Sequence, residues 1–124
     1  MTDALHSALQ GLRQVLDAPR GEGPALGAWR WTVRQRLSAV RESLVHEHGH
    51  AGNSWLTPQE DTVQRERKAL LTRMAALAPT VLEAPAVDEL CQELRRLVSD
   101  VARHRQHLHD LAYDDVEMEL GGSE

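Results

Sequence analysis

Apolar residues recur every three or four positions along most of the chain, which is the spacing of one face of an α-helix. Proline, glycine and small polar residues interrupt this pattern at residues 19–24, 49–53 and 79–85. We therefore predict four amphipathic helices, at about residues 3–18, 25–50, 58–78 and 86–119. The last segment has the most regular stripe, which steps by three and four from Val87 to Met118.

Composition agrees with an all-α fold. The sequence contains no phenylalanine and no isoleucine, and its valines occur singly, so it has little of what strands favour. Four amphipathic helices with short connections can bury their stripes only against one another. We expect one domain over residues 1–120, folded as an antiparallel up-down-up-down four-helix bundle, and a flexible tail at 121–124.

The charge is unevenly distributed. The net charge is −5, and the last fifteen residues carry six carboxylates with no lysine or arginine, which leaves +1 for residues 1–109. A near-neutral body with an acidic end does not attract phosphate backbones, so nucleic acid is not an expected partner. The sequence also has no membrane-length apolar run and no secretion signal. With the single Cys91, these features predict a cytoplasmic protein with no membrane association.

Polar residues replace apolar ones at inward steps of two predicted helices. Glu66 or Arg67 takes such a step in the third helix, and His104 takes one in the fourth. At a rise of about 1.5 Å per residue, Glu66 lies ~24 Å and His104 ~25 Å from the same end of an antiparallel bundle. All the histidines belong to the half of the bundle that contains these two residues: His6, His46, His48, His50, His104, His107 and His109.

Two interpretations of this polar half remain open. Imidazole and carboxylate ligands that project inward from facing helices form non-haem iron and manganese sites. The same groups can instead form a network of hydrogen bonds and ion pairs, because buried charges require partners. We expect His50 and His107 to face solvent in either case.

The segment 103–113 (Arg-His-Arg-Gln-His-Leu-His-Asp-Leu-Ala-Tyr), followed by an acidic stretch and Gly121-Gly122, resembles the closing helix of small actinobacterial hemerythrin-like (HHE) proteins. The chain length, the bundle pattern and the histidine-rich end are similar to that family as well. This resemblance implies a four-helix bundle around a non-haem di-iron centre that binds or senses oxygen or related small ligands.

On this resemblance, His6 corresponds to the ligand of the first helix, and His48, or alternatively His46, corresponds to that of the second. His104, or His109 with Asp114, corresponds to the pair on the fourth helix. The third helix departs from the family pattern, since residues 58–83 contain no histidine where two are expected one turn apart. The resulting set of metal candidates is incomplete: His6, His48, Glu66, His104, His109 and Asp114.

Three functions follow as hypotheses. The first is a hemerythrin-like bundle that has lost its di-iron site and acts as a small binding or regulatory module without a cofactor. The alternative is a non-haem iron protein, mononuclear or dinuclear, that binds or senses oxygen or nitric oxide. The third is an interaction subunit, as a homodimer or with another protein, because Trp31 and Trp55 lie off the predicted core. No phosphate loop, nucleophile elbow or paired-cysteine motif is present, so we expect no enzymatic activity.

Overall fold

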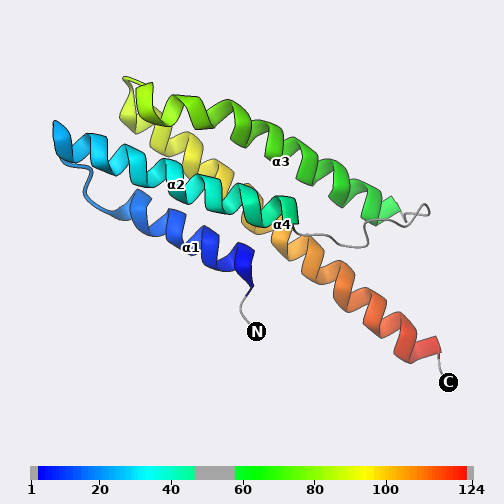
Figure 1. Cartoon of the computed structure of the whole chain (residues 1–124). Coiled ribbons are helices and arrows are strands. Elements are labelled where there is room, and N and C mark those ends of the chain that lie inside the picture. Colours follow the sequence, from blue (N-terminus) through cyan, green and yellow to red (C-terminus); the bar gives the residue numbers. More distant parts are fainter. Residues whose placement is uncertain (1–2, 47–57, 123–124) are drawn as a thin grey trace.

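The computed structural model describes the backbone of residues 3–46 and 58–122, and the side chains of these residues up to 112. The described residues form helices and no strand, which confirms the all-α prediction (Figure 1). The four helices are α1 (Ala4–Asp17), α2 (Pro24–His46), α3 (Pro58–Glu83) and α4 (Val87–Gly122).

The apolar stripes of the four helices form the core. Trp29 on α2 and Leu94 on α4 are buried as their helical spacing predicts, whereas Trp31 is 51% exposed on another face of α2. None of the described helices is long and apolar enough to cross a membrane. The buried apolar side chains are Leu5, Leu9, Leu12, Leu16, Trp29, Val33, Leu37, Val40, Leu44, Leu70, Met74, Val81, Leu90, Leu94, Leu97, Val98 and Val101.

The prediction that the third helix ends at residue 78 is wrong, because α3 continues through Pro79 to Glu83. A proline inside a helix removes one hydrogen bond and crowds the preceding turn. The continued helix offsets this cost in two ways. It buries Val81 completely. In addition, the Arg30 guanidinium donates to the carbonyls of Val81 at 3.2 Å and of Ala84 at 2.7 Å, which supplies partners to the end of α3.

The predicted end of the fourth helix differs from the structure, and the predicted end of the second helix is not described. The fourth helix extends beyond residue 119 and includes Gly121 and Gly122, whereas the sequence predicts a tail from residue 121. The second helix is described as far as His46, so its predicted end at residue 50 lies outside the described residues.

Each helix contacts the next one along the chain, and α1 also contacts α4, which is compatible with a bundle. At one end, the last turn of α1 lies beside the start of α2 and the first half of α4. The Trp29 indole N–H donates to the Val15 carbonyl at 2.8 Å. Arg95 donates to the Leu16 carbonyl at 2.9 Å and pairs with Asp17 at 2.8 Å. These contacts add hydrogen-bond donors to carbonyls in the last turn of α1, where the helical hydrogen bonding ends.

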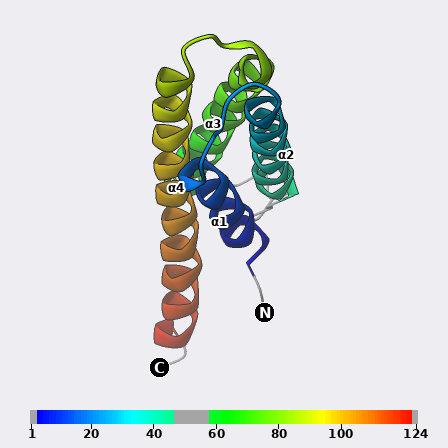
Figure 2. The same ribbon diagram turned by 90° about the vertical axis from the view of Figure 1, so that its left-hand side faces the viewer.

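At the other end, α1 begins beside the last turn of α2 and the second half of α4. Asp3 caps α1, since its carboxylate accepts the backbone N–H groups of Leu5 and His6. The same carboxylate pairs with Arg105 on α4 at 2.6 Å. From that level, α4 continues to Gly122 and projects beyond the other helices (Figure 2).

Candidate functional site

One carboxylate and two imidazoles meet between α3 and α4, and we call them the Glu66 cluster. The Oε1 atom of Glu66 lies 2.7 Å from Nδ1 of His104 and 3.1 Å from Nδ1 of His107. The two histidines are three residues apart, so they project from the same side of α4. The His104 side chain is fully buried, whereas those of Glu66 and His107 are 28% and 43% exposed.

The protonation states of this cluster follow from burial and hydrogen bonding. Burial lowers the pKa of His104, and the neighbouring Glu66 carboxylate raises it by less, so the net shift is downward. Burial also raises the pKa of Glu66, but the hydrogen bonds from His104 and His107 lower it by more in total. Near neutral pH, the ionised Glu66 carboxylate therefore accepts a hydrogen bond from Nδ1–H of a neutral His104.

The neutral form of His104 explains an otherwise unusual feature of the core. With its proton on Nδ1, the ring keeps only an acceptor lone pair at Nε2. This Nε2 atom is buried and has no hydrogen-bond partner among the described residues. Protonation of Nε2 would add a buried donor with nothing to receive it, which agrees with the lowered pKa.

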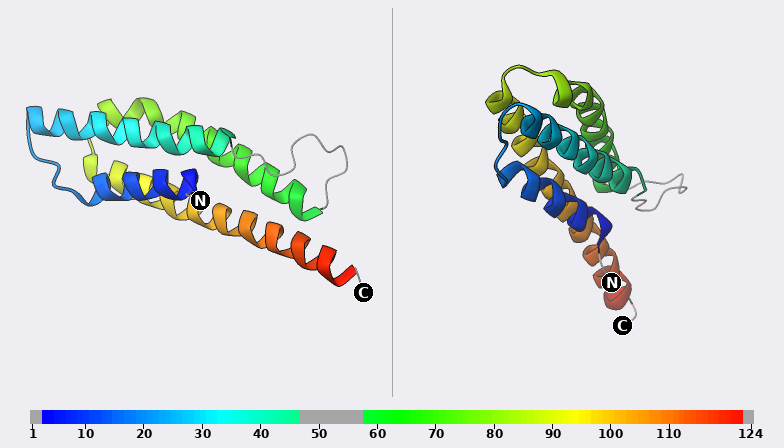
Figure 3. Two further views of the ribbon diagram at one scale, coloured as in Figure 1. Left: turned by 60° about the horizontal axis from the view of Figure 1, so that its bottom comes forward. Right: turned by 60° about the vertical axis from the view of Figure 1, so that its left-hand side comes forward.

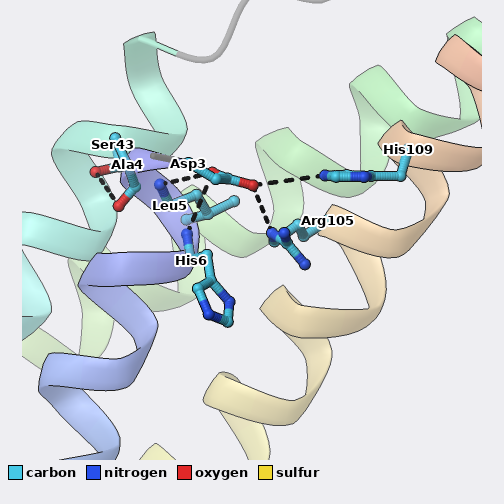
Figure 4. Close-up of polar contacts among 7 residues, drawn as sticks. All are labelled: Asp3, Ala4, Leu5, His6, Ser43, Arg105 and His109. Carbon is cyan, nitrogen blue, oxygen red and sulfur yellow. Dashed lines mark hydrogen bonds and ion pairs between the residues drawn. The ribbon is translucent and has the colours of Figure 1, made fainter. Parts of the chain in front are cut away.

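A second cluster of polar residues lies around Asp3, which is the first described residue of the chain (Figure 4). We call it the Asp3 cluster. Asp3 accepts from Arg105 at 2.6 Å, and its Oδ2 atom lies 3.5 Å from Nε2 of His109. His6 takes part through its backbone N–H, while its exposed ring is directed away from Asp3 (Figure 4). Burial raises the pKa of Asp3, but its hydrogen bonds, led by that from Arg105, produce a net lowering.

The structure thus brings together only part of the predicted metal set. Glu66 and His104 are adjacent, while His109 and His6 belong to the separate Asp3 cluster. The predicted ligand His48 lies outside the described residues, and the Asp114 side chain lies beyond the last described one.

His107 corrects the sequence interpretation. The sequence predicts that its side chain faces solvent, but it hydrogen-bonds to Glu66 while remaining partly exposed. The signal that would have identified it is its spacing of three residues from His104, which places both rings on one side of a helix.

The described residues do not fit a di-iron centre. Among them, no three or more histidine, cysteine, aspartate or glutamate side chains are arranged to hold a metal ion. The Oε1 atom of Glu66 is already bonded to both imidazoles of its cluster. The Asp3 carboxylate is paired with the cationic Arg105, which disfavours a second cation at the same oxygens.

A groove adjoins the Glu66 cluster, and we call it the α3–α4 groove. Its volume is about 400 Å³ and its lining is predominantly apolar. His107 belongs to both the groove and the Glu66 cluster. The groove is lined by Pro58, Gln59, Thr62, Val63, His107, Asp110 and Leu111.

Comparisons with known proteins give no match, whether to a protein-family model, to a curated protein or to a solved structure. The hemerythrin-like resemblance of residues 103–113 therefore remains a prediction from sequence. The function has to be inferred from the Glu66 cluster and the α3–α4 groove themselves.

Proposed function

We propose that this chain is an antiparallel up-down-up-down bundle of hemerythrin-like design that lacks a di-iron centre and acts as a small binding module. Its binding site is the α3–α4 groove. The observation that carries the proposal is the dual position of His107, which hydrogen-bonds to Glu66 and lines the groove. The Glu66 cluster then has a structural role, because it fixes one wall of the binding site.

The chemistry of the polar half supports a module that works without metal. Metal sites require a full set of ligands and supporting hydrogen bonds. Here the Glu66 carboxylate is engaged by two imidazoles, and Arg105 neutralises Asp3. The third helix supplies no histidine, so the family pattern lacks two of its ligands.

The groove itself supports a binding role. Binding sites are typically concave and mostly apolar, with a few polar groups that orient the ligand. Val63 and Leu111 provide apolar surface, while His107 and Asp110 provide polar groups at the α4 wall. His107 has one imidazole nitrogen held by Glu66, so the orientation of its ring is restricted.

Metal analysis tests this proposal most directly. Protein purified without a histidine tag is expected to contain far less than one equivalent of iron, manganese or zinc. Added ferrous iron under anaerobic conditions is expected to leave the thermal midpoint of unfolding unchanged. Stoichiometric iron with charge-transfer absorption would contradict the proposal.

A second candidate is a non-haem iron protein, mononuclear or dinuclear, that binds or senses oxygen or nitric oxide. It is favoured by the buried, unpartnered Nε2 atom of His104, whose Nδ1 atom is held by a carboxylate. Metal-binding histidines often have this arrangement, with the second nitrogen bonded to a carboxylate. A complete site would require ligands beyond the described residues, for which His48 is the sequence candidate.

Paired variants separate the two candidates. In an iron protein, His104→Ala and His48→Ala would both abolish stoichiometric iron binding, while His6→Ala, at an exposed ring away from the Glu66 cluster, would retain it. In a metal-independent module, none of the three variants changes the metal content.

A further inference from the structure

We infer that the outer face shared by α2 and α3 binds an acidic amphipathic helix from a partner protein. This surface, the α2–α3 face, is separate from the α3–α4 groove, so the inference goes beyond the proposed function. Apolar side chains of the incoming helix would cover exposed apolar residues, and its carboxylates would pair with cations of the face. The face consists of Trp31, Arg34, Ser38, Arg41 and Val45 on α2 and of Lys68, Leu71, Ala75, Ala78 and Leu82 on α3.

The first argument is that exposed apolar side chains gather on these two helices. Within the described residues, the large apolar side chains that remain exposed are Trp31 at 51%, Leu82 at 39% and Val45 at 38%. All three belong to α2 or α3, and α1 and the described side chains of α4 contribute none. Single exposed apolar residues are common, whereas a group of them on one surface indicates an interaction site.

Contacts with the neighbouring helices show where the stripe on α2 lies. The Arg36 side chain lies against Gly11, and the Ser43 hydroxyl donates to the Ala4 carbonyl, so one flank of α2 faces α1. Arg30 donates to two carbonyls at the end of α3, so the other flank faces α3. Residues spaced by three and four share one side of a helix, and such a stripe lies on the outer surface next to the Arg30 flank. It consists of Trp31, Arg34, Ser38, Arg41 and Val45.

The stripe on α3 lies on the flank that faces α2. Arg73 pairs with Asp100 and Glu66 pairs with His104, so the flank that carries Arg73 and Glu66 faces α4. Leu82 follows Arg73 by nine residues, which is two and a half turns at ~3.6 residues per turn, and it therefore lies on the opposite side of the helix. The residues that share this side of α3 are Lys68, Leu71, Ala75, Ala78 and Leu82.

The two stripes lie side by side. Arg30 reaches the Val81 carbonyl, so the residues that follow each of them, Trp31 and Leu82, are at the same level. Figure 3 shows the start of α2 beside the end of α3, with the rest of α2 following the middle of α3. Two turns from this level, α2 has Ser38 and α3 has Ala75. These small side chains allow the backbone of a docked helix to approach closely between the larger apolar residues.

The second argument is charge. In the part of the chain that the structure describes, Arg34, Arg41 and Lys68 have no carboxylate partner. The single carboxylate of α2, Glu42, lines a pocket together with the first turn of α1. Between residues 64 and 82, α3 carries one carboxylate, Glu66, which is bonded to the histidines of α4. An acidic partner therefore supplies the countercharges that this face lacks.

Trp31 and Arg34 already contact each other in the centre of this charge pattern. The guanidinium carbon of Arg34 lies 5.5 Å from the centroid of the Trp31 ring. The attraction between a cation and an aromatic ring restricts the arginine side chain. Its N–H groups remain available for a bidentate pair with a carboxylate. Tryptophan and arginine are also the residue types that most often dominate the energy of an interface, so we place the main contact here.

A helix from a protein fits this surface better than a phosphate backbone does. Both stripes belong to helices, and the ridges of a third helix pack between them. An amphipathic helix presents apolar residues at i, i+3, i+4 and i+7 and keeps carboxylates at its flanks. The stripe from Trp31 to Val45 is about 21 Å long at 1.5 Å per residue, which is enough for several turns. Three dispersed cations do not form the dense basic surface that nucleic acids require.

Peptide binding to the full chain tests the inference. The probe is a fluorescent helical peptide of leucine and glutamate with one apolar face, about 18 residues and ~27 Å long. Binding, followed by fluorescence anisotropy, is expected to saturate and to weaken as salt screens the charges. Two matched peptides should not bind, one with lysine in place of glutamate and one with the same composition but no apolar face.

Matched protein variants locate the site. We expect Trp31→Ala, Arg34→Glu and Leu82→Glu each to weaken peptide binding about tenfold. Arg103→Glu repeats the charge reversal at an exposed arginine of α4, and Leu111→Glu repeats the leucine substitution in the α3–α4 groove. Both controls are expected to bind the peptide like the unmodified protein. Circular dichroism verifies that every variant keeps its helix content.

Four results would overturn the inference. They are absence of binding by the acidic peptide, equal weakening in Arg34→Glu and Arg103→Glu, a dimer that Trp31→Ala dissociates, and binding of phosphatidylserine vesicles that Arg34→Glu abolishes. The third result would mean that a second copy covers the face, and the fourth that a lipid surface does.

The outcome for the proposed function is separate. Weakening of peptide binding in Leu111→Glu but not in Leu82→Glu would place the peptide in the α3–α4 groove, and it would overturn only the assignment to the α2–α3 face. Stoichiometric iron would contradict the metal-independent module whether or not the acidic peptide binds.

Discussion

Glu66 on α3 and His104 on α4 are joined by a hydrogen bond of 2.7 Å between Oε1 and Nδ1. His104 is the polar side chain that is fully buried within the described core. A buried imidazole requires a partner for its N–H, because an unsatisfied donor in the core costs more than the bond contributes when formed. The pair therefore fixes how α3 and α4 are positioned against each other at the polar half of the bundle.

Substitution of Glu66 tests this role. In Glu66→Ala the Nδ1–H group of His104 loses its partner, so we expect the free energy of unfolding to fall by about 1–3 kcal/mol. Glu66→Gln keeps an acceptor oxygen, and its loss should be smaller. Glu83→Ala, at an exposed position on the same helix, is expected to stay within about 0.5 kcal/mol of the unmodified protein. Urea denaturation measures all three, and equal values for Glu66→Ala and Glu83→Ala would contradict the structural role.

The pKa shifts predict the direction of the pH dependence. The pKa of His104 is lowered in the folded protein from its ordinary value of 6.5, so the unfolded chain binds its proton more readily. Stability from this group is complete above pH 6.5 and is lost as the pH falls toward the lower folded value. Glu66 also has a lowered pKa and contributes a further loss below its ordinary value of 4.5.

Thermal unfolding between pH 5 and 8 measures the first step, since the shift in the pKa of His104 predicts a decrease toward pH 5. His104→Gln removes the titrating group and should flatten this part of the profile. A profile for the unmodified protein that is already flat would show that His104 does not titrate differently in the folded and unfolded states.

Asp3 separates the effect of a helix cap from that of an ion pair. Asp3→Ala removes both the cap of α1 and the partner of Arg105, and we expect a loss of about 1–2 kcal/mol in unfolding free energy. Asp3→Asn keeps a capping oxygen and loses only the charge. Its loss should stay below about 1 kcal/mol, because the pair with Arg105 is partly exposed. Similar losses in both variants would assign the effect to charge.

Pro79 is a position where substitution should stabilise the protein. It lies inside α3 at an exposed site, where the missing N–H leaves one helical carbonyl without its usual partner. Pro79→Ala restores this bond and the higher helix propensity of alanine, so the free energy of unfolding should rise by about 1 kcal/mol or more. The greater flexibility of the unfolded variant opposes part of this gain. A destabilised variant would mean that the proline is needed for the bend or packing of α3.

Local sequence information was sufficient for the helices and for most of the core. The stripe on α4 predicted the burial of Leu94 and Val101, and it also identified His104 as an inward polar residue. Helix rise in the expected antiparallel bundle placed Glu66 or Arg67 at the height of His104, and the structure shows that Glu66 is the residue that contacts it. These features are predictable because helical periodicity is local, and because an apolar face that recurs every three or four residues must be buried.

The tertiary structure decided the features that depend on how neighbouring helices are rotated and aligned. His107 rather than His109 joins Glu66, and Asp3 binds Arg105, because the offset between α1, α3 and α4 sets which side chains meet. The passage of α3 through Pro79 depends on contacts with Arg30, which is far away in sequence. Apart from the three-residue spacing of His104 and His107, these relationships have no periodic signal, since each is set by residues that only packing brings together.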